Sequence, residues 1–378
     1  MSDTIAVIGG GPAGLEAARG AAELGANVVL VEQEAFLGGT PIREHYAALT
    51  PHFQSAEEAM GTLIEGVTQA GVEVLLEHRL TACEGEAPDF RLTLSGPGGE
   101  RIVECGGIIV ATGFEHFDPG RETQLYGYYE YPDVLALQDL EAMLKEHNVV
   151  RPSTGLPPER ICFVQCVGSR DRHIGNEYCS KVCCGVASKE AIEVRQQLPG
   201  CKVFIFYIDM RMYGYWENQI YWPAQEQHHV QYIKGIITEV LPKGDKLLVR
   251  GEDTTMGRPM EVAMDMVVLS VGMEPSKGTR AMAGLLGITP NKYGFIEAAN
   301  PPLDTVSTNR RGIWACGAAL GPADLEDCAS SGGAAAMKAV AFLRRKPVAV
   351  AGSPSPSTPG PGPVAGSPLP ASPHSAPV

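Results

Sequence analysis

The feature that most constrains the fold is a glycine-rich turn near the start of this chain of 378 residues. The apolar stretch Thr4–Ile8 predicts a strand, and residues 12–24 carry the pattern of a helix. The turn Gly-Gly-Gly-Pro-Ala-Gly joins the two at residues 9–14. A strand, a tight turn and a helix in this order predict the first unit of a parallel α/β sheet.

The glycines of this turn fit the pattern G-x-G-x-x-G. Gly9 permits the tight turn, Gly11 lets the backbone approach a pyrophosphate, and Gly14 lets the helix pack closely on the strand. Pro12 and Ala13 begin the helix, and the free N–H groups of its first turn are donors for phosphate. The turn is therefore interpreted as a dinucleotide-binding site.

An acidic residue and three further segments narrow the choice of dinucleotide. Glu32 ends the next predicted strand, about 20 residues after the turn, where a carboxylate accepts hydrogen bonds from ribose hydroxyls. The three segments are Gly-Gly-Thr at residues 38–40, Val-Ala-Thr-Gly at 110–113 and Gly-Ile-Trp-Ala-Cys-Gly at 312–317. Together these features resemble the thioredoxin reductase-like flavoproteins, which have two dinucleotide-binding domains, and they favour FAD over NAD.

This resemblance implies a set of FAD contacts. They are Gly9, Gly11, Pro12, Ala13, Gly14, Glu32, Gly39, Thr40, Ala111, Thr112, Gly113, Gly317 and Ala318. One position departs from the group's pattern, because an aspartate usually follows the last glycine and this chain has Ala318. We expect the backbone or another residue to make that contact.

The charge of the chain excludes several classes of protein. It has 30 Lys and Arg against 44 Asp and Glu, a net charge of −14, which makes it a poor ligand for nucleic acid or anionic membranes. No apolar run approaches the roughly 18 residues of a membrane span, and the N-terminus lacks a secretory signal. We expect a cytoplasmic protein, in which ten cysteines indicate metal, cluster or redox chemistry rather than structural disulfides.

Four of the cysteines are concentrated in one loop. Cys166, Cys179, Cys183 and Cys184 lie between a predicted strand, Ile161–Gln165, and the helix that follows it. In a reductase of the thioredoxin reductase type, this junction carries a second glycine-rich turn for NAD(P)H. Here it reads Val-Gly-Ser-Arg-Asp at residues 167–171, followed by the cysteines. We therefore predict that NAD(P)H is not a direct substrate.

Four thiolates in one short loop suit an iron–sulfur cluster or a zinc ion. The adjacent Cys183 and Cys184 fit a cubane cluster better, because each can reach a different iron, whereas both would crowd one tetrahedral zinc. We expect one [4Fe–4S] cluster held by all four cysteines. A reactive disulfide and buried inert thiols stay open as alternatives.

The cysteine loop also carries a family resemblance. The stretches 163–171, 178–180, 182–184, 207–211 and 126–134 resemble the A subunit of heterodisulfide reductase, over about residues 1–345. In that family the four matching cysteines hold a [4Fe–4S] cluster beside FAD. The ferredoxin pattern C-x2-C-x2-C-x3-C of the methanogen proteins is absent, so the chain resembles a core-only member. Such a core is similar to the A-type component of the heterodisulfide reductase-like complex of sulfur-oxidising bacteria, and to that of the quinone-interacting oxidoreductase.

The resemblance implies an α/β fold of two dinucleotide-binding domains, the second inserted into the first. We expect an FAD-binding domain at residues 1–118 and 266–346 and the cluster-bearing domain at 119–265. Residues 347–378 are rich in Pro, Gly and Ser and are expected to be a disordered tail.

The function implied is electron transfer within a cytoplasmic complex that oxidises carrier-bound sulfur. FAD would exchange one or two electrons and the cluster single electrons with other subunits, and we expect a homodimer. Two alternatives stay open. One is an NAD(P)H-dependent disulfide reductase with a Cys183–Cys184 redox pair, and the other is a structural component whose cofactors serve assembly alone.

Overall fold

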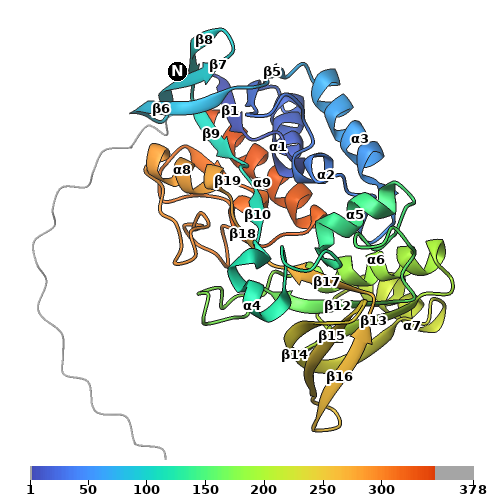
Figure 1. Cartoon of the computed structure of the whole chain (residues 1–378). Helices are drawn as coiled ribbons and strands as arrows, with labels where there is room; N and C mark the ends of the chain where they lie inside the picture. Colours follow the sequence, from blue (N-terminus) through green and yellow to red (C-terminus); the bar gives the residue numbers. More distant parts are fainter. Residues whose placement is uncertain (1, 345–378) are drawn as a thin grey trace, which may run out of the picture. The chain divides into compact units, whose positions relative to one another are not determined.

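The fold is that of a computed structural model, which describes residues 2–344. The tail expected at residues 347–378 lies outside the described residues. Two α/β sheets, each with helices packed against it, make up the described part of the chain (Figure 1).

The first sheet is parallel and has the strand order β19-β9-β1-β2-β5. Its strands are β1 (Thr4–Ile8), β2 (Asn27–Val31), β5 (Glu73–Leu75), β9 (Gly107–Val110) and β19 (Ile313–Ala315). β9 and β19 are buried at every position, as expected for short apolar strands covered on both faces. A glycine lets two helices meet closely on one face, because a Cβ on Gly332 would lie 2.5 Å from the oxygen of Ala13.

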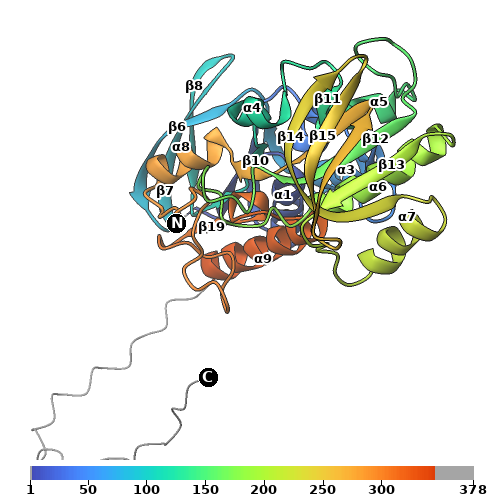
Figure 2. The ribbon, with the colours of Figure 1, turned by 60° about the horizontal axis from the view of Figure 1, so that its bottom comes forward.

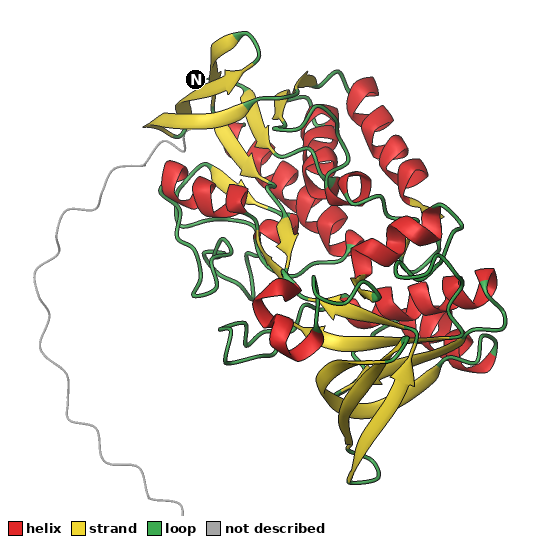
Figure 3. Cartoon of the chain, viewed as in Figure 1, coloured by secondary structure: helices red, strands yellow, loops and turns green. Residues whose placement is uncertain are grey.

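Helices and small sheets surround this first sheet (Figure 3). The helices are α1 (Pro12–Glu23), α2 (Thr40–Arg43), α3 (Ala56–Gln69), α8 (Lys277–Leu286), α9 (Leu325–Leu343) and the 3₁₀ turn η3 (Gly317–Ala319). An antiparallel sheet contains β6 (Arg79–Glu86), β7 (Asp89–Gly96) and β8 (Gly99–Cys105). A short hairpin pairs β3 (Ala48–Leu49) with β4 (Gln54–Ser55).

The second sheet has the order β11-β17-β12-β13-β14-β15-β16. Figure 2 shows its strands β12, β13, β14 and β15. Its strands are β11 (Val134–Ala136), β12 (Arg160–Val167), β13 (Lys202–Tyr207), β14 (Gln231–Lys243), β15 (Lys246–Asp253), β16 (Arg258–Met264) and β17 (Met266–Val271). The first five strands of the order are parallel, and β14, β15 and β16 form an antiparallel meander. The helices of this domain are η1 (Pro119–Glu122), α4 (Thr123–Tyr126), α5 (Leu137–Lys145), α6 (Cys183–Gln197), η2 (Glu217–Tyr221) and α7 (Trp222–Glu226).

The chain passes between the two sheets through a pair of short strands. β10 (Phe114–His116) leaves the first domain and pairs antiparallel with β18 (Met273–Pro275), which returns to it. The second domain is therefore an insertion into the first, as the sequence predicts.

One expected boundary differs from the structure. The sequence places the end of the inserted domain at residue 265, but β17 pairs with β11 and β12 in the second sheet. The return to the first domain therefore comes after Val271. The sequence Met-Val-Val-Leu-Ser-Val is buried along its whole length, so its apolar pattern suits a central strand of either sheet.

Candidate functional site

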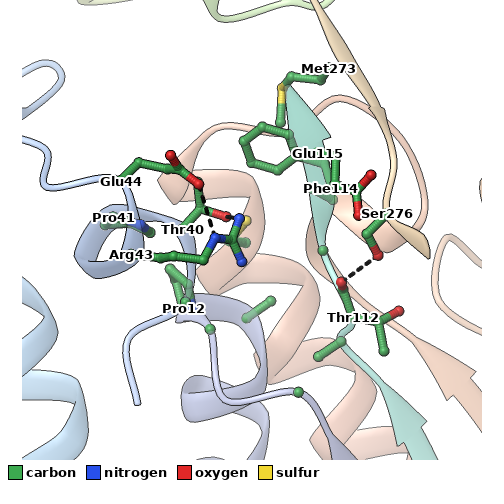
Figure 4. Close-up of a pocket in the computed structure, with 18 of the residues that line it drawn as sticks. Pro12, Thr40, Pro41, Arg43, Glu44, Thr112, Phe114, Glu115, Met273 and Ser276 are labelled. Atoms are coloured by element: carbon green, nitrogen blue, oxygen red, sulfur yellow. Dashed lines mark hydrogen bonds and ion pairs between the residues drawn. The ribbon is translucent and has the colours of Figure 1, made fainter. Parts of the chain in front are cut away.

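A cavity of about 900 Å³ opens beside the glycine-rich turn and reaches the inserted domain. Eleven of the thirteen predicted FAD contacts line it: Gly9, Gly11, Pro12, Ala13, Glu32, Gly39, Thr40, Ala111, Thr112, Gly113 and Ala318. Figure 4 shows Pro12, Thr40 and Arg43 on one side of this cavity and Thr112, Phe114 and Met273 on the other. Residues from five separate segments of the first domain therefore surround one space.

The glycine at the entrance to α1 leaves room for a ligand. An ideal Cβ on Gly11 would meet only the Cα of Gly39, at 3.7 Å, so the protein itself does not require a glycine there for packing. Gly39 has a φ of +61°, and a Cβ on it would lie 2.7 Å from the Cα of Gly11. Gly11 and Gly39 thus lie next to each other in the wall of the cavity. Because neither has a side chain, a pyrophosphate can approach the backbone there.

The remaining glycines hold the turn together. A Cβ on Gly14 would lie 1.9 Å from the oxygen of Gly9, and a Cβ on Gly317 would lie 2.5 Å from the Cβ of Ala13. Gly14 and Gly317 do not line the cavity, so their part is to let α1 and η3 approach their neighbours. This agrees with the packing role that the sequence pattern gives Gly14. Of the thirteen predicted FAD contacts, Gly14 and Gly317 are the two that do not line the cavity.

The Glu32 carboxylate is buried, with 8% of the residue exposed, and it braces the turn. One oxygen accepts a hydrogen bond from the N–H of Gly10 at 2.6 Å, and the other accepts from the N–H of Glu34 at 2.9 Å. A carboxylate has about four acceptor positions. Glu32 therefore retains acceptor capacity toward the cavity that it lines.

The cysteine loop brings its thiols near one another at the start of α6. Cys183 and Cys184 are buried, whereas Cys166 and Cys179 are partly exposed. Burial, followed by the charge of Cys184, raises the pKa of the Cys166 thiol to about 11. A hydrogen bond from Cys183 lowers the pKa of Cys184 to about 7, while the same bond and burial raise the pKa of Cys183.

One of the thiols has an N–H donor beside it. The main-chain N–H of Lys181 lies 3.3 Å from the sulfur of Cys179 and donates to it. The positive charge of Arg170 acts to lower the pKa of Cys166, but burial outweighs it. Within residues 2–344 no three His, Cys, Asp or Glu side chains have the spacing of a ready metal site.

Cys183 connects the loop with the cavity, because it lines the same space as the glycine-rich turn. Lys181 of the loop pairs with Asp327 and, at 3.3 Å, with Asp324, which are residues of the first domain at the start of α9. Tyr213 of the inserted domain also donates to Asp324. Ion pairs and a hydrogen bond thus connect the cysteine loop and the segment of Tyr213 with the first domain next to the cavity.

Where a nucleotide-binding domain would carry a second glycine-rich turn, a phenylalanine fills the space. Gly168 follows β12 with a φ of +73°, and a Cβ on it would lie 2.0 Å from the ring of Phe117. Phe117 is fully buried. The glycine that the sequence retains here therefore accommodates an aromatic ring.

A buried group of charges, which the sequence did not predict, lies at the inner end of the cavity. Lys189 is 1% exposed; its ammonium donates to the oxygen of Ala48 at 3.0 Å and pairs with Glu141 and, at 3.0 Å, with Glu193. Burial lowers the pKa of Lys189, but the neighbouring carboxylates outweigh burial and the net pKa is raised. Burial and the charge of Glu141 raise the pKa of Glu190 well above its usual value.

A second polar pair borders the same cavity. The hydroxyl of Tyr46 lies 2.8 Å from Nε2 of His116, and burial lowers the pKa of His116 to about 4.

One signal for the buried charges around Lys189 was available in the sequence. Lys189 and Glu193 recur at helical spacing on α6, which starts at the cysteines, so their face had to meet either solvent or a polar site.

The cysteines outside the loop behave as packed thiols. Cys316 and Cys328 line the cavity, and burial raises the pKa of both thiols, to about 12 for Cys328. Burial likewise raises the pKa of Cys105 and of Cys201 to about 12. None of these four thiols is activated toward thiolate chemistry.

Among residues 2–344, no helix is both long enough and apolar enough to cross a membrane.

Comparisons with known proteins agree with this geometry. Residues 3–164 match the pyridine nucleotide-disulphide oxidoreductase family, and the match ends just before the first cysteine of the loop. The chain is 37% identical over 249 residues to the A subunit of the H(2):CoB-CoM heterodisulfide,ferredoxin reductase of Methanothermobacter thermautotrophicus. That alignment covers 64% of this chain and 38% of the relative.

Two further relatives give the same family. The iron-sulfur A subunit 2 of the CoB–CoM heterodisulfide reductase of Methanopyrus kandleri is 39% identical, over 65% of this chain and 39% of its own length. The A subunit of the Ferredoxin/F(420)H(2)-dependent CoB-CoM heterodisulfide reductase of Methanosarcina acetivorans is 30% identical, over 90% of this chain and 53% of its own. The chain thus spans between a third and about half of the curated relatives that it matches.

Solved structures agree on the fold. The thioredoxin reductase of Lactococcus lactis superimposes with a TM-score of 0.61 at 21% identity, over 90% of this chain and 98% of that one. The thioredoxin reductase of T. acidophilum has the same TM-score at 15% identity. The fold is therefore the FAD-binding fold of the thioredoxin reductases. The family match over residues 3–164 and these relatives show that the chain is an oxidoreductase homologous, over part of their length, to the A subunits of the heterodisulfide reductases.

Proposed function

We propose that the chain is the FAD- and [4Fe–4S]-containing electron-transfer subunit of a heterodisulfide reductase-like complex. The observation that carries the proposal is the position of Cys183, which belongs to the four-cysteine loop and also lines the cavity of the glycine-rich turn. A two-electron carrier and a one-electron carrier held at these two places would be neighbours. Such a pair converts between two-electron and one-electron transfer.

The cavity residues fit FAD by their shape and charge. Gly11 and Gly39 leave the backbone open to a pyrophosphate, α1 offers the N–H groups of its first turn, and Glu32 offers acceptors to a ribose. When bound, FAD would supply reversible one- and two-electron chemistry. The protein's own part is to orient the cofactor between the two walls of the cavity and to exclude water from its inner end.

The cysteine loop fits an iron–sulfur cluster by its donor set. Cys166, Cys179, Cys183 and Cys184 are soft ligands of the kind that such clusters use, and a bound cluster would supply single-electron transfer. The main-chain N–H of Lys181, which donates to the sulfur of Cys179, is a donor of the kind found beside the sulfur ligands of such clusters. Gln165 and Ser169 on either side of Cys166 have buried polar atoms without hydrogen-bond partners among the described residues, which suits a loop closed around a further group.

We further propose that the chain works in a multi-subunit, cytoplasmic complex. The relatives' names describe A subunits of heterodisulfide reductases, one of them an iron-sulfur subunit. The core-only resemblance favours a complex that oxidises carrier-bound sulfur, with a homodimer of this chain and with other subunits carrying the thiol chemistry. The corresponding component of a quinone-interacting oxidoreductase is the alternative with the same cofactors.

A second candidate function has one observation in its favour. Cys183 and Cys184 are hydrogen-bonded neighbours, and a pKa of about 7 at Cys184 gives it the thiolate character of a disulfide-exchange residue. A flavin disulfide reductase would use such a pair. Against it stands the segment after β12, which lacks a second G-x-G-x-x-G turn and whose Gly168 is packed against Phe117.

The decisive experiment is an anaerobic preparation of the whole chain, with iron, acid-labile sulfide and flavin counted per chain. We expect four irons and one FAD, and a paramagnetic signal from the reduced protein. Cys184→Ala is expected to lose the cluster and keep FAD, whereas Cys201→Ala, which removes a buried thiol outside the loop, is expected to keep both.

Three results would count against the proposal. Zinc in place of iron, or a complete cluster in Cys184→Ala, would refute the four-ligand assignment. An iron-free protein in which two thiols per chain are oxidised and reduced reversibly would favour the disulfide reductase. A bound flavin that no reductant reduces would favour a purely structural role.

A further inference from the structure

One face of α6 forms part of the cavity wall. Its residues Cys183, Val186 and Glu190 line the cavity, and their spacing of three and four residues places them on the same side of the helix. Two turns of helix separate Glu190 from Cys183, which corresponds to about 10 Å along the helix axis. A carboxyl group therefore belongs to the wall of the cavity at a clear distance from the cysteine loop.

Glu190 is buried without a partner in the protein. The residue is 0% exposed, and neither of its carboxyl oxygens has a hydrogen-bond partner among the described residues. A buried polar group without a partner costs free energy, and an ionised carboxylate in that situation costs the most. A proton on the carboxyl group, together with a ligand in the cavity, removes this cost.

The charges around Glu190 leave it without a counterion. Lys189 pairs with Glu141 of α5 and, at 3.0 Å, with Glu193 one turn further along α6. Glu141 also accepts a hydrogen bond from the N–H of Ala47 at 2.9 Å. Within the described part of the chain these ion pairs join two carboxylates to one ammonium, so an ionised Glu190 would add a third negative charge to a group that is already net negative.

Two further titratable groups border this part of the cavity, and neither supplies a positive charge at neutral pH. Burial lowers the pKa of His116 to about 4 and raises the pKa of Tyr46 well above its usual value. Burial, followed by the charge of Glu141, raises the pKa of Glu190, and the charge of Lys189 only partly opposes this rise. The electrostatics of the wall thus agree with the count of its ion pairs.

We propose that Glu190 holds a proton in the oxidised protein and is the proton donor to the cofactor of the cavity when that cofactor is reduced. The inference rests on the proposed function, in which FAD occupies the cavity. Because the glycine-rich turn and Glu32 account for a pyrophosphate and a ribose, the flavin ring is the part of FAD left for the rest of the cavity. Burial is a common way in which proteins keep a carboxyl group protonated for acid catalysis.

The proposed exchange balances in protons and electrons. On reduction the electron pair comes from the reductant, the O–H bond of Glu190 breaks, and an N–H bond forms on the flavin ring. Glu190 is left as a carboxylate, whose charge is opposed by that of Lys189. When an acceptor removes the electron pair, the proton returns to Glu190.

The first test is infrared difference spectroscopy of the whole holoprotein, recorded while an electrode reduces the flavin. We expect a band of a protonated carboxyl group, shifted in heavy water, that is present in the oxidised wild type and lost on reduction. Glu190→Gln is expected to lack this band. Glu193→Gln is the matched control and should keep it, because Glu193 pairs with Lys189 but does not line the cavity.

Three infrared results would overturn the inference: no protonated carboxyl band, a band that reduction leaves unchanged, or a band that disappears in Glu193→Gln and persists in Glu190→Gln. If Glu190→Gln does not retain its flavin, Glu190→Asp decides the question. This variant keeps a carboxyl group that is one methylene shorter, so its band should appear at a shifted frequency and again be lost on reduction. A band at the wild-type frequency in Glu190→Asp would assign the proton to another residue.

The second test is denaturant unfolding of the full chain, which does not depend on flavin reduction. A carboxyl group that keeps its proton in the fold and loses it in the unfolded chain makes stability fall as the pH rises above about 4.3. Glu190→Gln cannot titrate, so its free energy of unfolding minus that of the wild type should increase from about pH 4.5 to pH 8. A difference that does not change with pH would show that Glu190 does not hold a proton.

The outcomes also distinguish this inference from the proposed function. A wild-type protein that binds no flavin would refute the proposed function and the donor role with it, whereas the unfolding comparison would still report the proton on Glu190. A wild-type protein that binds flavin, with Glu190→Gln matching it in both tests, would refute the inference alone.

Discussion

The ring of Phe117 lies against the Cα of Gly168, so that a Cβ on this glycine would come within 2.0 Å of the ring. Phe117 enters from the segment after β10, and Gly168 follows β12 at the carboxyl edge of the second sheet. That edge is where parallel sheets of this kind bind a nucleotide. The ring of Phe117 is therefore packed at the edge of the second sheet where a nucleotide would be expected.

We predict that NADH and NADPH do not reduce the flavin of the isolated protein. The physical reason is that the segment between β12 and α6 does not form a second G-x-G-x-x-G turn, and that Phe117 packs on Gly168 at the start of this segment. The measurement is anaerobic flavin absorbance after a stoichiometric addition of either nucleotide, with dithionite as the positive control. Rapid bleaching by NADH would contradict the prediction and favour the disulfide reductase.

Gly11→Val is expected to yield a folded protein without flavin. The Cβ at this position has room in the protein itself, so the branched side chain projects into the cavity rather than into the core. Gly61→Val is the control, because a Cβ on Gly61 of α3 meets nothing within 4 Å. Flavin content per chain and circular dichroism are the measurements.

A third glycine variant completes the comparison of Gly11→Val with Gly61→Val. Gly14→Ala places a Cβ 1.9 Å from the oxygen of Gly9, so we expect loss of the fold together with the flavin. Full flavin content in Gly11→Val would show that the pyrophosphate does not pass this residue.

Lys189→Met is expected to destabilise the protein by about 3–5 kcal/mol, because it leaves Glu141 and Glu193 buried without their cation. The matched control is Lys145→Met, which breaks an exposed pair with Glu57 and should cost no more than about 1 kcal/mol. Denaturant unfolding of the three proteins at neutral pH provides the comparison. Equal stability of the two variants would mean that the buried lysine is not charged.

His116 is expected to make stability fall in mildly acidic solution. Its pKa in the fold is about 4, below the ordinary 6.5, so the fold favours the neutral ring. The stabilisation is present above pH 6.5 and is lost as the pH falls through 6.5 toward 4, up to about 3 kcal/mol. His116→Gln, which cannot titrate, should lose less stability than the wild type between about pH 7.5 and pH 4.5. Parallel losses in the two proteins would contradict this.

The sequence predicts the parts of the site that are local in the chain. Gly9 to Gly14 form a turn whose geometry depends on six consecutive residues, and Glu32 is placed by the next strand. The cysteine loop is visible for the same reason, since its four thiols fall between one strand and one helix.

The buried polar residues of the cavity could not be predicted from local sequence patterns. Lys189 and Glu141 lie on two helices of the inserted domain, α6 and α5, and His116 lies on β10, so these residues are far apart in the sequence. Their partners are set by tertiary contact; the helical spacing of Lys189 and Glu193 indicates a polar face but does not say what that face meets. The predicted domain boundary at residue 265 was wrong for a related reason. The apolar pattern of β17 is equally compatible with either sheet.

The antiparallel pair of β10 and β18 has a consequence for the history and engineering of the chain. His116 and Met273 are opposite each other in the register, so the points where the chain leaves and re-enters the first domain are adjacent. A foreign module with similarly close termini can be spliced there without disturbing the register of the first sheet. The inserted domain can thereby be exchanged as one piece, by recombination at two neighbouring strands.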